Sequence, residues 1–156
     1  MTDDHLYRRG VGVMLLNRDG KVFVAARIDN PDDAWQMPQG GIDADEEPWP
    51  AALREVEEET GVTPDLVERI ADCGEPLRYE IPEEWRPRHW DRQWKGQLQH
   101  WFLARFLGRD EDIDLNTDHP EFRAWQWVEP RSLPELIVPF KRDLYRRLLD
   151  DFAAYL

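Results

Sequence analysis

The segment from Gly40 to Val62 holds the side chains of this protein that are best suited to chemistry. It runs GGIDADEEPWPAALREVEEETGV. On a helix that advances about 100° per residue, Glu55, Glu58 and Glu59 fall within an arc of roughly 100° and form one acidic face. Neighbouring like charges on a helix repel by about a few tenths of a kcal/mol per pair. We therefore expect this face either to bind cations or to have another functional role. Glu57 points elsewhere, and we expect it to be solvated surface.

Grouped carboxylates favour a particular metal chemistry. Hard oxygen ligands select Mg²⁺, with Mn²⁺ as a possible substitute. Such ions bridge phosphate oxygens, neutralise the charge that builds during displacement and lower the pKa of a bound water. The pattern therefore indicates metal-assisted hydrolysis of a phosphoanhydride. The alternative is that a glutamate-rich amphipathic helix is only a solvated face, and the surrounding residues decide between the two.

These surrounding residues follow a fixed spacing. It consists of Gly40, five residues, Glu46, seven residues, Arg54-Glu55-Val56, one residue, Glu58-Glu59, one residue, and Gly61-Val62. A chance match of this length has a probability on the order of one in a million or less. Here the chain resembles the Nudix hydrolases. The resemblance implies that the three helical glutamates hold the metals, that one of them also serves as the base for water, and that the Gly40 carbonyl is a further ligand. It also implies that Arg54 pairs with Glu46 and braces the loop against the helix.

A narrower resemblance extends along nearly the whole chain. It is carried by Tyr7-Arg8 with Val11-Gly12, by Trp35 to Gly41, by Pro120-Glu121-Phe122, by Trp125 to Val128 and by Phe140 to Arg146. These segments resemble the bacterial branch of RNA pyrophosphohydrolases and dinucleoside polyphosphate hydrolases, and plant diadenosine tetraphosphate hydrolases are similar. The resemblance implies that Glu121 is a further acidic group near the metals. Without the resemblance, Glu121 would be interpreted as an exposed glutamate at a strand edge.

The same resemblance suggests how the substrate is held. Arg8 and Arg27 would bind phosphates, for which a guanidinium fork is well suited, although each could be a surface arginine. Gln39 would contact the phosphates or fix the catalytic loop. Tyr79, Phe140 and Lys141 would line a nucleobase pocket, where an aromatic face stacks on a base for about 1–3 kcal/mol. The alternative for the phenylalanine is core packing at the start of a helix.

The segment from Trp85 to Lys95 mixes positive charge with large rings. Its sequence is WRPRHWDRQWK. Such interleaving suits single-stranded RNA or a second nucleoside, through phosphate contacts and stacking. A cross-packed loop or a dimer contact would explain the composition equally well.

The chemistry needs elements that position it, and these follow from local patterns. Two strands joined by an Asp-Gly turn are expected first, then a short strand, the Gly40-Gly41 turn and a helix that begins near Pro48 and stops at Gly61. The strands are predicted at 11–16, 21–27, 35–38, 66–73, 77–81, 97–106 and 122–128, and the helices at 48–60 and 139–156. We therefore predict an α/β fold of the Nudix type, with a mixed β-sheet sandwiched between α-helices.

Composition sets the remaining bounds. The 156 residues fit a single domain, 1–156, and 41% hydrophobic residues suffice for a folded core. No stretch resembles a membrane span or a secretory signal, and Cys73 is the single cysteine, so a cytoplasmic protein without a disulfide is expected. The net charge of −13 argues against broad adhesion to nucleic acid or anionic membranes.

Together these patterns predict hydrolysis of a nucleoside polyphosphate. The favoured substrate is the 5′ end of triphosphorylated RNA, which would release pyrophosphate, with diadenosine polyphosphate cleavage as a second activity. The alternatives are a dedicated diadenosine tetraphosphate hydrolase, a pyrophosphatase of nucleoside triphosphates or nucleotide sugars, and a non-catalytic nucleotide sensor on the same fold. The box alone does not choose among substrates, because one scaffold hosts many chemistries.

Overall fold

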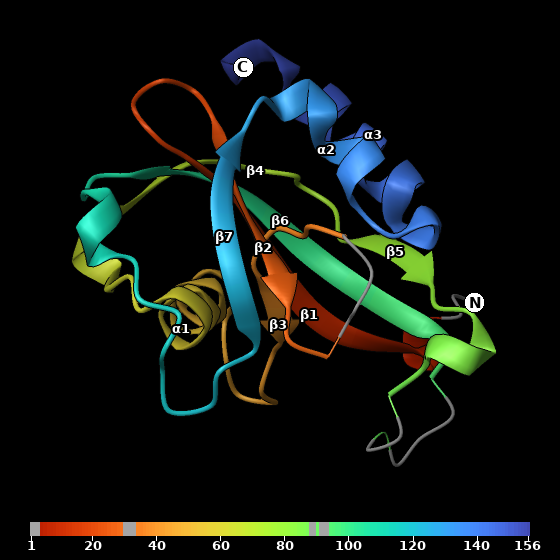
Figure 1. The fold of residues 1–156 in the computed structure, drawn as a ribbon. Helices are drawn as coiled ribbons and strands as arrows, with labels where there is room; N and C mark the ends of the chain where they lie inside the picture. The colour runs from red at the N-terminus through yellow and green to blue at the C-terminus, as the bar shows by residue number, and fades with distance from the viewer. Residues whose placement is uncertain (1–3, 30–33, 88–89, 91–93) are drawn as a thin grey trace.

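A mixed β-sheet forms the centre of the protein in the computed structural model (Figure 1). The structure describes residues 4–29, 34–87, 90 and 94–156. Its strands are β1 (Tyr7–Leu16), β2 (Val22–Arg27), β3 (Gln39–Gly41), β4 (Val67–Asp72), β5 (Leu77–Glu80), β6 (Gly96–Phe106) and β7 (Phe122–Val128). The main order is β4-β6-β1-β2-β7, while β3 pairs with β1 and β5 pairs with β6. The β1–β6 pair is parallel and the other pairs are antiparallel, which makes the sheet mixed, as predicted.

Strand β1 is buried on both faces because its side chains alternate between two cores. Val11, Val13 and Leu15 pack into the cluster on one face, whereas Met14 and Leu16 pack into the cluster on the other. Successive side chains of a strand point to opposite faces, so a continuous apolar run fills both.

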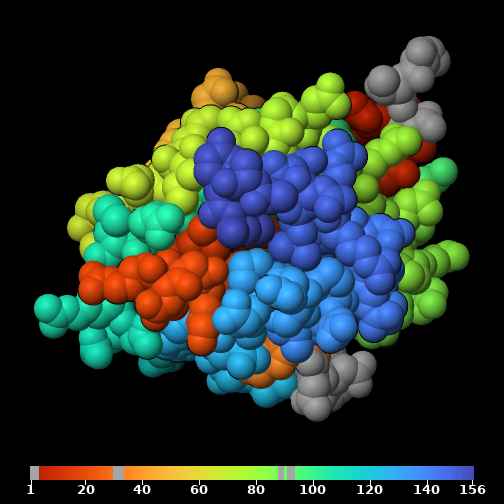
Figure 2. Space-filling view, turned by 90° about the horizontal axis from the view of Figure 1, so that it is seen from above, coloured from red at the N-terminus to blue at the C-terminus, as the bar shows by residue number. Residues whose placement is uncertain are grey.

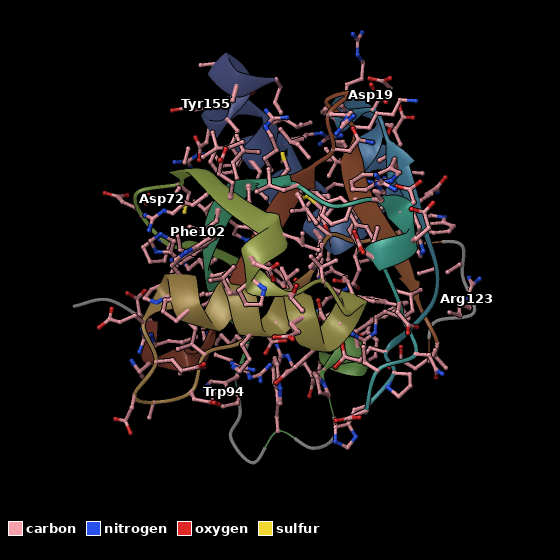
Figure 3. The ribbon with its side chains drawn as sticks, turned by 90° about the vertical axis from the view of Figure 1, so that its left-hand side faces the viewer. Asp19, Asp72, Trp94, Phe102, Arg123 and Tyr155 are labelled. Atoms are coloured by element: carbon pink, nitrogen blue, oxygen red, sulfur yellow. The ribbon has the colours of Figure 1, made fainter. Side chains whose placement is uncertain are left out.

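Helices cover both faces of this sheet (Figure 1). Helix α1 (Pro48–Thr60) packs on one core, and Trp49 meets Phe102 of β6 there with ring centroids 5.0 Å apart (Figure 3). Helices α2 (Leu133–Leu136) and α3 (Arg142–Asp151) cover the other core. The space-filling view from above shows this C-terminal segment lying across its face (Figure 2). The sandwich architecture is therefore confirmed.

Short 3₁₀ turns connect many of these elements. They span Asp4–Leu6, Pro64–Leu66, Glu83–Trp85, Asp110–Asp112, Pro130–Ser132, Pro139–Lys141 and Ala153–Tyr155. Several begin at or next to a proline, whose fixed φ suits the first turn of a helix. No helix within 4–29, 34–87, 90 or 94–156 combines the length and apolar character needed to cross a membrane.

Helix α1 has the bounds that its sequence predicts. Pro48 occupies the first turn, where a missing N–H costs nothing. The helix ends at Gly61, which has a φ of +75° and donates its N–H to the carbonyl of Glu57 at 2.9 Å. This left-handed conformation suits glycine, which has no Cβ to clash.

Two predicted elements differ from the structure. The strand expected at 35–38 is reduced to a single bridge between Gln36 and Ala25, and β3 forms instead where a glycine turn was expected. Strand β3 fits there because Gly10 of β1 lets the chain approach closely: a Cβ at Gly10 would lie 2.7 Å from the Gly40 carbonyl oxygen. The final helix, expected at 139–156, is divided into a 3₁₀ turn, α3 and another 3₁₀ turn.

Candidate active site

A cavity of about 830 Å³ lies where strand β3, helix α1 and residues 138–141 meet. It is lined by Arg8, Arg27, Asp29, Gln36, Gln39, Gly40, Gly41, Glu55, Glu58, Tyr79, Ile81, Glu84, Trp85, Pro87, Trp90, Gln97, Glu121, Val138, Phe140 and Lys141. All six residues predicted to bind substrate belong to this lining, as do four of the five predicted metal ligands. The fifth, Glu59, is buried behind it, at 3% exposure. Segments far apart in the sequence thus converge on one cavity.

The loop before α1 is tied to the helix by one arginine. Arg54 donates from Nε and Nη2 to the two carboxylate oxygens of Glu46, both at 2.7 Å, and Nη2 also donates to the Gly41 carbonyl at 2.9 Å. The Glu46 carboxylate further accepts the Asp43 N–H at 2.9 Å. The hydrogen bonds from Arg54 are the main cause that lowers the pKa of Glu46 to about 2. The pairing that the Nudix resemblance implies is present in the structure, and it fixes the loop as a bidentate brace.

The two glycines of β3 lie against charged side chains. A Cβ at Gly40 would overlap the carboxylate of Glu55, and a Cβ at Gly41 would overlap the guanidinium of Arg8. Any larger residue would therefore displace a predicted ligand or a predicted phosphate-binding group. From the sequence, both glycines were expected to form a turn and Gly40 to offer its carbonyl to the metal, whereas the structure shows that lack of space is what requires glycine at both positions.

The carboxylates of the site lie close enough to repel one another. Glu59 accepts the Gln39 N–H at 3.1 Å, yet burial first, and repulsion from Glu121 and Glu55 next, raise its pKa well above the usual range. Burial is also the first cause that raises the pKa of Glu55 to about 7, and Glu58 and Glu121 add to it. Such mutual repulsion between like charges favours the binding of a cation.

These donors fit a hard divalent cation. The candidate ligands are carboxylate oxygens and a backbone carbonyl, which are the ligand types of Mg²⁺ and Mn²⁺. Among the residues that the structure describes, no group of three or more histidine, cysteine, aspartate or glutamate side chains is already arranged so that it could hold a metal ion. The reason is visible in their partners. Glu59 is turned to a backbone N–H, and Glu55 accepts from Nη1 of Arg54 at 2.9 Å.

Glu58 differs from the other two helical glutamates. Its side chain is 58% exposed and accepts from Nη1 of Arg54 at 3.2 Å. The three therefore do not form one uniformly exposed acidic face. They differ in exposure: Glu59 is buried, Glu55 is half-buried and Glu58 is open to the cavity.

Two arginines belong to the same cavity, Arg8 on β1 and Arg27 at the end of β2. Arg8 lies over Gly41, and Arg27 forms two hydrogen bonds with the Asp29 carboxylate, at 2.8 and 3.0 Å. Both guanidinium groups line the cavity. A phosphate that entered would compete with Asp29 for the Arg27 fork, because both present paired oxygen acceptors.

The other end of the cavity is aromatic. The rings of Tyr79 and Phe140 are nearly parallel, with an interplanar angle of 26° and centroids 6.3 Å apart. The ammonium of Lys141 lies 5.3 Å from the centre of the Tyr79 ring. Lys141 is only 6% exposed, and burial is the first cause that lowers its pKa to about 7. The three predicted base-pocket residues are thus brought together.

A buried hydrogen-bond chain, which the sequence analysis missed, joins the two ends. Trp101 Nε1 donates to Gln99 Oε1 at 3.0 Å, and Gln99 Nε2 donates to Gln39 Oε1 at 3.1 Å. Lys141 Nζ donates to the same Gln39 oxygen at 3.2 Å. The indole N–H of Trp101 can only donate, so Gln99 accepts with Oε1 and donates with Nε2 to Gln39. Two glutamines at alternate positions in an otherwise apolar strand were the available signal.

Two glutamine side-chain atoms near the cavity are buried and have no hydrogen-bond partner among the described residues. Gln97 Nε2 donates to the Tyr79 hydroxyl at 3.0 Å, but Gln97 Oε1 has no hydrogen-bond partner, and neither has Gln36 Nε2. Both side chains line the cavity. Buried polar atoms normally find partners, so an acceptor and a donor are left for a bound molecule or water.

The segment from Trp85 to Lys95 contributes the outer wall of the cavity. Trp85, Pro87 and Trp90 belong to the lining, and Trp90 also packs on Trp94 with centroids 5.3 Å apart. Residues 88–89 and 91–93, which carry much of the segment's predicted positive charge, lie outside the described residues.

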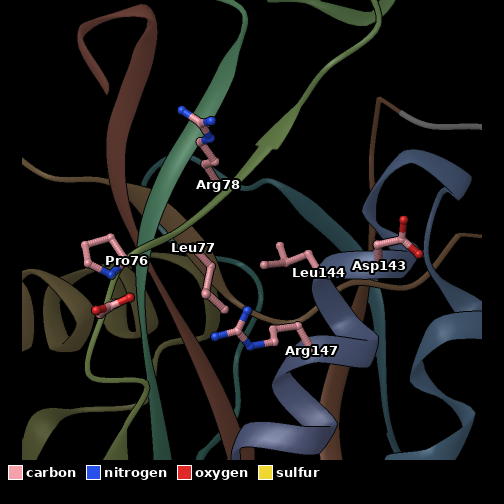
Figure 4. Close-up of a pocket in the computed structure, with 7 residues that line it drawn as sticks. Pro76, Leu77, Arg78, Asp143, Leu144 and Arg147 are labelled. Atoms are coloured by element: carbon pink, nitrogen blue, oxygen red, sulfur yellow. The ribbon is translucent and has the colours of Figure 1, made fainter. Parts of the chain in front are cut away.

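A smaller cavity of about 350 Å³ lies between β5 and α3 and lacks these features (Figure 4). It is lined by Glu75, Pro76, Leu77, Arg78, Asp143, Leu144 and Arg147. Arg147 is already paired with Asp151 at 3.0 Å, and none of the predicted site residues reaches this cavity. The larger cavity is therefore the candidate active site.

Comparison with known proteins places this geometry in a family. The family model described as the NUDIX domain matches residues 6–148. The chain is 54% identical to an RNA pyrophosphohydrolase of Zymomonas mobilis over 154 residues, which cover 99% of each protein. It is 48% identical to an RNA pyrophosphohydrolase of Dinoroseobacter shibae over 160 residues, which cover 100% of both.

Solved structures share the fold at lower identity. An Ap4A hydrolase of C. elegans, in a binary complex, matches with a TM-score of 0.66 and 23% identity, covering 93% of this chain and 98% of that one. The E. coli dihydroneopterin triphosphate pyrophosphohydrolase matches with a TM-score of 0.73 and 21% identity, with the same coverage. At this level of identity the likeness concerns the fold.

Proposed function

Because the chain belongs to the NUDIX domain family, we propose that it is a hydrolase that removes pyrophosphate from the 5′ end of triphosphorylated RNA. The relatives that are about half identical over nearly their whole length are RNA pyrophosphohydrolases, which supports this substrate. Such an enzyme would meet its substrate in the cytoplasm, which is the localisation that we propose.

One observation carries the proposal: a single cavity joins a cluster of carboxylates to an aromatic pocket. Glu55 and Glu121 line one part of it, and Tyr79 and Phe140 line another. A nucleoside attached to a run of phosphates needs this pair of environments, because its base stacks on rings and its phosphates need cations.

We assign the metal site to Glu55, Glu58, Glu59, Glu121 and the Gly40 carbonyl, and Mg²⁺ is the cation that we expect there. When bound, the cation would offset phosphate charge and activate water near neutral pH. The protein's own groups do the rest. Arg54 and Glu46 hold the loop that carries Gly40 in place against α1.

The remaining side chains orient the substrate. Arg8 and Arg27 would bind the phosphates, and the base would lie against Phe140 and Tyr79 beside the Lys141 ammonium. Gln39 would fix the distance between the two ends, because its side chain bonds Lys141 while its backbone N–H bonds Glu59. Holding the reactive groups in register in this way contributes to the rate.

A second activity, on dinucleoside polyphosphates such as diadenosine tetraphosphate, is favoured by the aromatic outer wall. The cavity offers Trp85 and Trp90 beyond the rings of the base pocket. A second nucleoside joined through a phosphate chain would find a surface there. A non-catalytic nucleotide sensor is disfavoured, because the complete set of Glu55, Glu58 and Glu59 is retained.

The test replaces one candidate ligand and compares it with a neighbour. Glu58→Gln should lower kcat on triphosphorylated RNA by on the order of 10²-fold or more, because it removes a charged ligand from the reaction centre. Glu57→Gln is the matched control, since Glu57 is equally exposed on the same helix and lies outside the cavity. Unchanged melting temperatures would show that both variants fold.

The assay should offer triphosphorylated RNA, diadenosine tetraphosphate, dGTP and ADP-ribose in separate reactions with Mg²⁺. We expect the highest kcat/KM for the RNA. Full activity of Glu58→Gln would overturn the assignment of that residue, and a clear preference for dGTP or ADP-ribose would overturn the proposed substrate.

A further inference from the structure

Trp85 is a large aromatic side chain left open at the rim of the candidate active site. It is 50% exposed and lines the cavity. It ends the 3₁₀ turn Glu83–Trp85, in which its N–H donates to the Pro82 carbonyl at 2.8 Å. Arg86 then donates from Nε to the Ile81 carbonyl at 2.9 Å and ties the turn back to the chain beside β5. The ring is therefore held at the rim by its backbone rather than by a partner on its open face.

The ring plane of Trp85 is inclined to the rings of Tyr79 and Phe140, which form the proposed base pocket. Its ring centroid lies 6.0 Å from that of Phe140, and the two planes are inclined by 60°. Tyr79 and Phe140, by contrast, are inclined by only 26°. A flat base can lie parallel to one of two rings that differ by 60°, but not to both. A base stacked on Phe140 therefore leaves the face of Trp85 for another group.

The charges near Trp85 indicate what kind of group this is. Glu83 and Glu84 precede it in the turn, and Glu84 lines the cavity, so a phosphate is disfavoured at this point. The guanidinium of Arg86 is engaged with a backbone carbonyl. An exposed indole beside carboxylates suits an uncharged aromatic face, and base stacking on such a ring does not depend on sequence.

We propose that Trp85 is a stacking surface for a second base of the substrate, next to the base held at Phe140, and that it makes the enzyme prefer RNA ends of two or more nucleotides over mononucleotides. This inference rests on the proposed function, because it assumes that the substrate enters this cavity with its phosphates at the acidic end. The short separation of the two rings suits consecutive nucleotides joined by one phosphodiester.

The test compares kcat/KM for a short RNA end with kcat/KM for a mononucleotide. For the native protein, kcat/KM should be higher for a triphosphorylated trinucleotide than for ATP. Trp85→Leu, which keeps an apolar side chain but has no aromatic face, should reduce the ratio of the two values by about 5- to 50-fold. Trp85→Phe keeps a flat ring and should retain most of the ratio.

A matched control removes another exposed aromatic side chain. Tyr155 is 54% exposed and lies at the opposite end of the molecule from Trp94, which belongs to the segment from Trp85 to Lys95 (Figure 3). Tyr155→Ala should leave the ratio unchanged. Melting temperatures of all variants would identify any loss of folding, and the ratio itself is insensitive to the fraction of folded enzyme.

Stacking can also be detected directly. In the Glu58→Gln background, a triphosphorylated trinucleotide with 2-aminopurine at its second or third position should lose fluorescence on binding. Adding Trp85→Leu should restore fluorescence at one of these positions, while Trp85→Phe should not. Restoration would place a particular base on the indole.

Three outcomes decide the matter. A fall in the ratio with restored fluorescence supports the role of Trp85. An equal change in kcat/KM for ATP and for the trinucleotide overturns it and leaves the proposed function intact. A native protein that does not hydrolyse triphosphorylated RNA at all overturns the proposed function and this inference together.

Discussion

At the scale of single residues, the site is built from ionisable groups that have been removed from water. Glu59 and Lys141 are both buried, and burial raises the pKa of the first and lowers the pKa of the second. Each group is thereby shifted toward its neutral form, which is costly for the fold unless a ligand needs the charge. Buried ionisable groups of this kind are typical of functional sites.

The burial of Lys141 makes the free energy of unfolding depend on pH, and the direction of this dependence can be predicted. Its pKa falls from 10.5 to about 7 on folding, so between these values the unfolded chain binds more protons and stability rises with pH. Below about pH 7 both states are protonated and the full penalty applies. Lys141→Met should therefore raise the free energy of unfolding at pH 6 by about 1–3 kcal/mol, and the gain should shrink toward pH 10.

Urea unfolding at a series of pH values would measure this difference. Lys95→Met is the control, because Lys95 is exposed. A gain that stayed constant across the whole range would contradict the buried-lysine explanation. Substrate affinity of Lys141→Met should fall, since the lysine lies beside the base pocket.

At the scale of elements, the C-terminal end of α1, which carries the acidic face, is fixed at Gly61. Gly61 ends the helix in a left-handed conformation, and a Cβ there would lie 2.8 Å from the Asp114 carbonyl oxygen. The Asp114 N–H in turn donates to the Thr60 carbonyl at 2.8 Å. The helix terminus is therefore held by a distant loop as well as by its own cap.

Gly61→Ala should destabilise the protein by about 2–4 kcal/mol, because it combines left-handed strain with a close contact. Gly20→Ala isolates the first of these effects. Gly20 has a similar φ of +76°, but a Cβ there would meet nothing within 4 Å, so only about 1–2 kcal/mol should be lost. Thermal unfolding would compare the two, and equal losses would show that the Asp114 contact is unimportant.

At the scale of the whole molecule, the net charge opposes the proposed substrate. A charge of −13 repels a polyanion at long range, whereas the cations of the site act only locally. Salt screens the long-range repulsion more than the short-range contacts, because the Debye length falls from about 30 Å at 0.01 M to about 8 Å at 0.15 M.

We therefore expect kcat/KM for triphosphorylated RNA to rise by about two- to fivefold between 0.01 and 0.15 M KCl at constant free Mg²⁺. The increase should be larger for a 20-nucleotide RNA than for a trinucleotide, because more charge must approach the protein. Initial rates at low substrate concentration would measure it. A steep fall with salt, as in proteins that bind nucleic acid through many phosphate contacts, would contradict the prediction.

The sequence by itself determined the elements whose signals are local. The bounds of α1 agree with the prediction because a proline start, an amphipathic period and a glycine stop act within the helix itself. The spacing of Glu46, Arg54 and the helical glutamates identified the chemistry for the same reason. Strand β3 was placed as a turn instead, because its pairing depends on Gly10, about thirty residues away.

Only the tertiary structure decided how each site residue is presented. Helical periodicity put Glu55, Glu58 and Glu59 on one face, but packing of α1 against β1 and β3 buried the last and left Glu58 exposed. The hydrogen-bond chain from Trp101 to Lys141 includes bonds between residues 60 and 102 positions apart, and the contact between Trp85 and Phe140 joins residues more than fifty positions apart. Burial and orientation arise from contacts that are distant in sequence, so no local pattern of residue types could specify them.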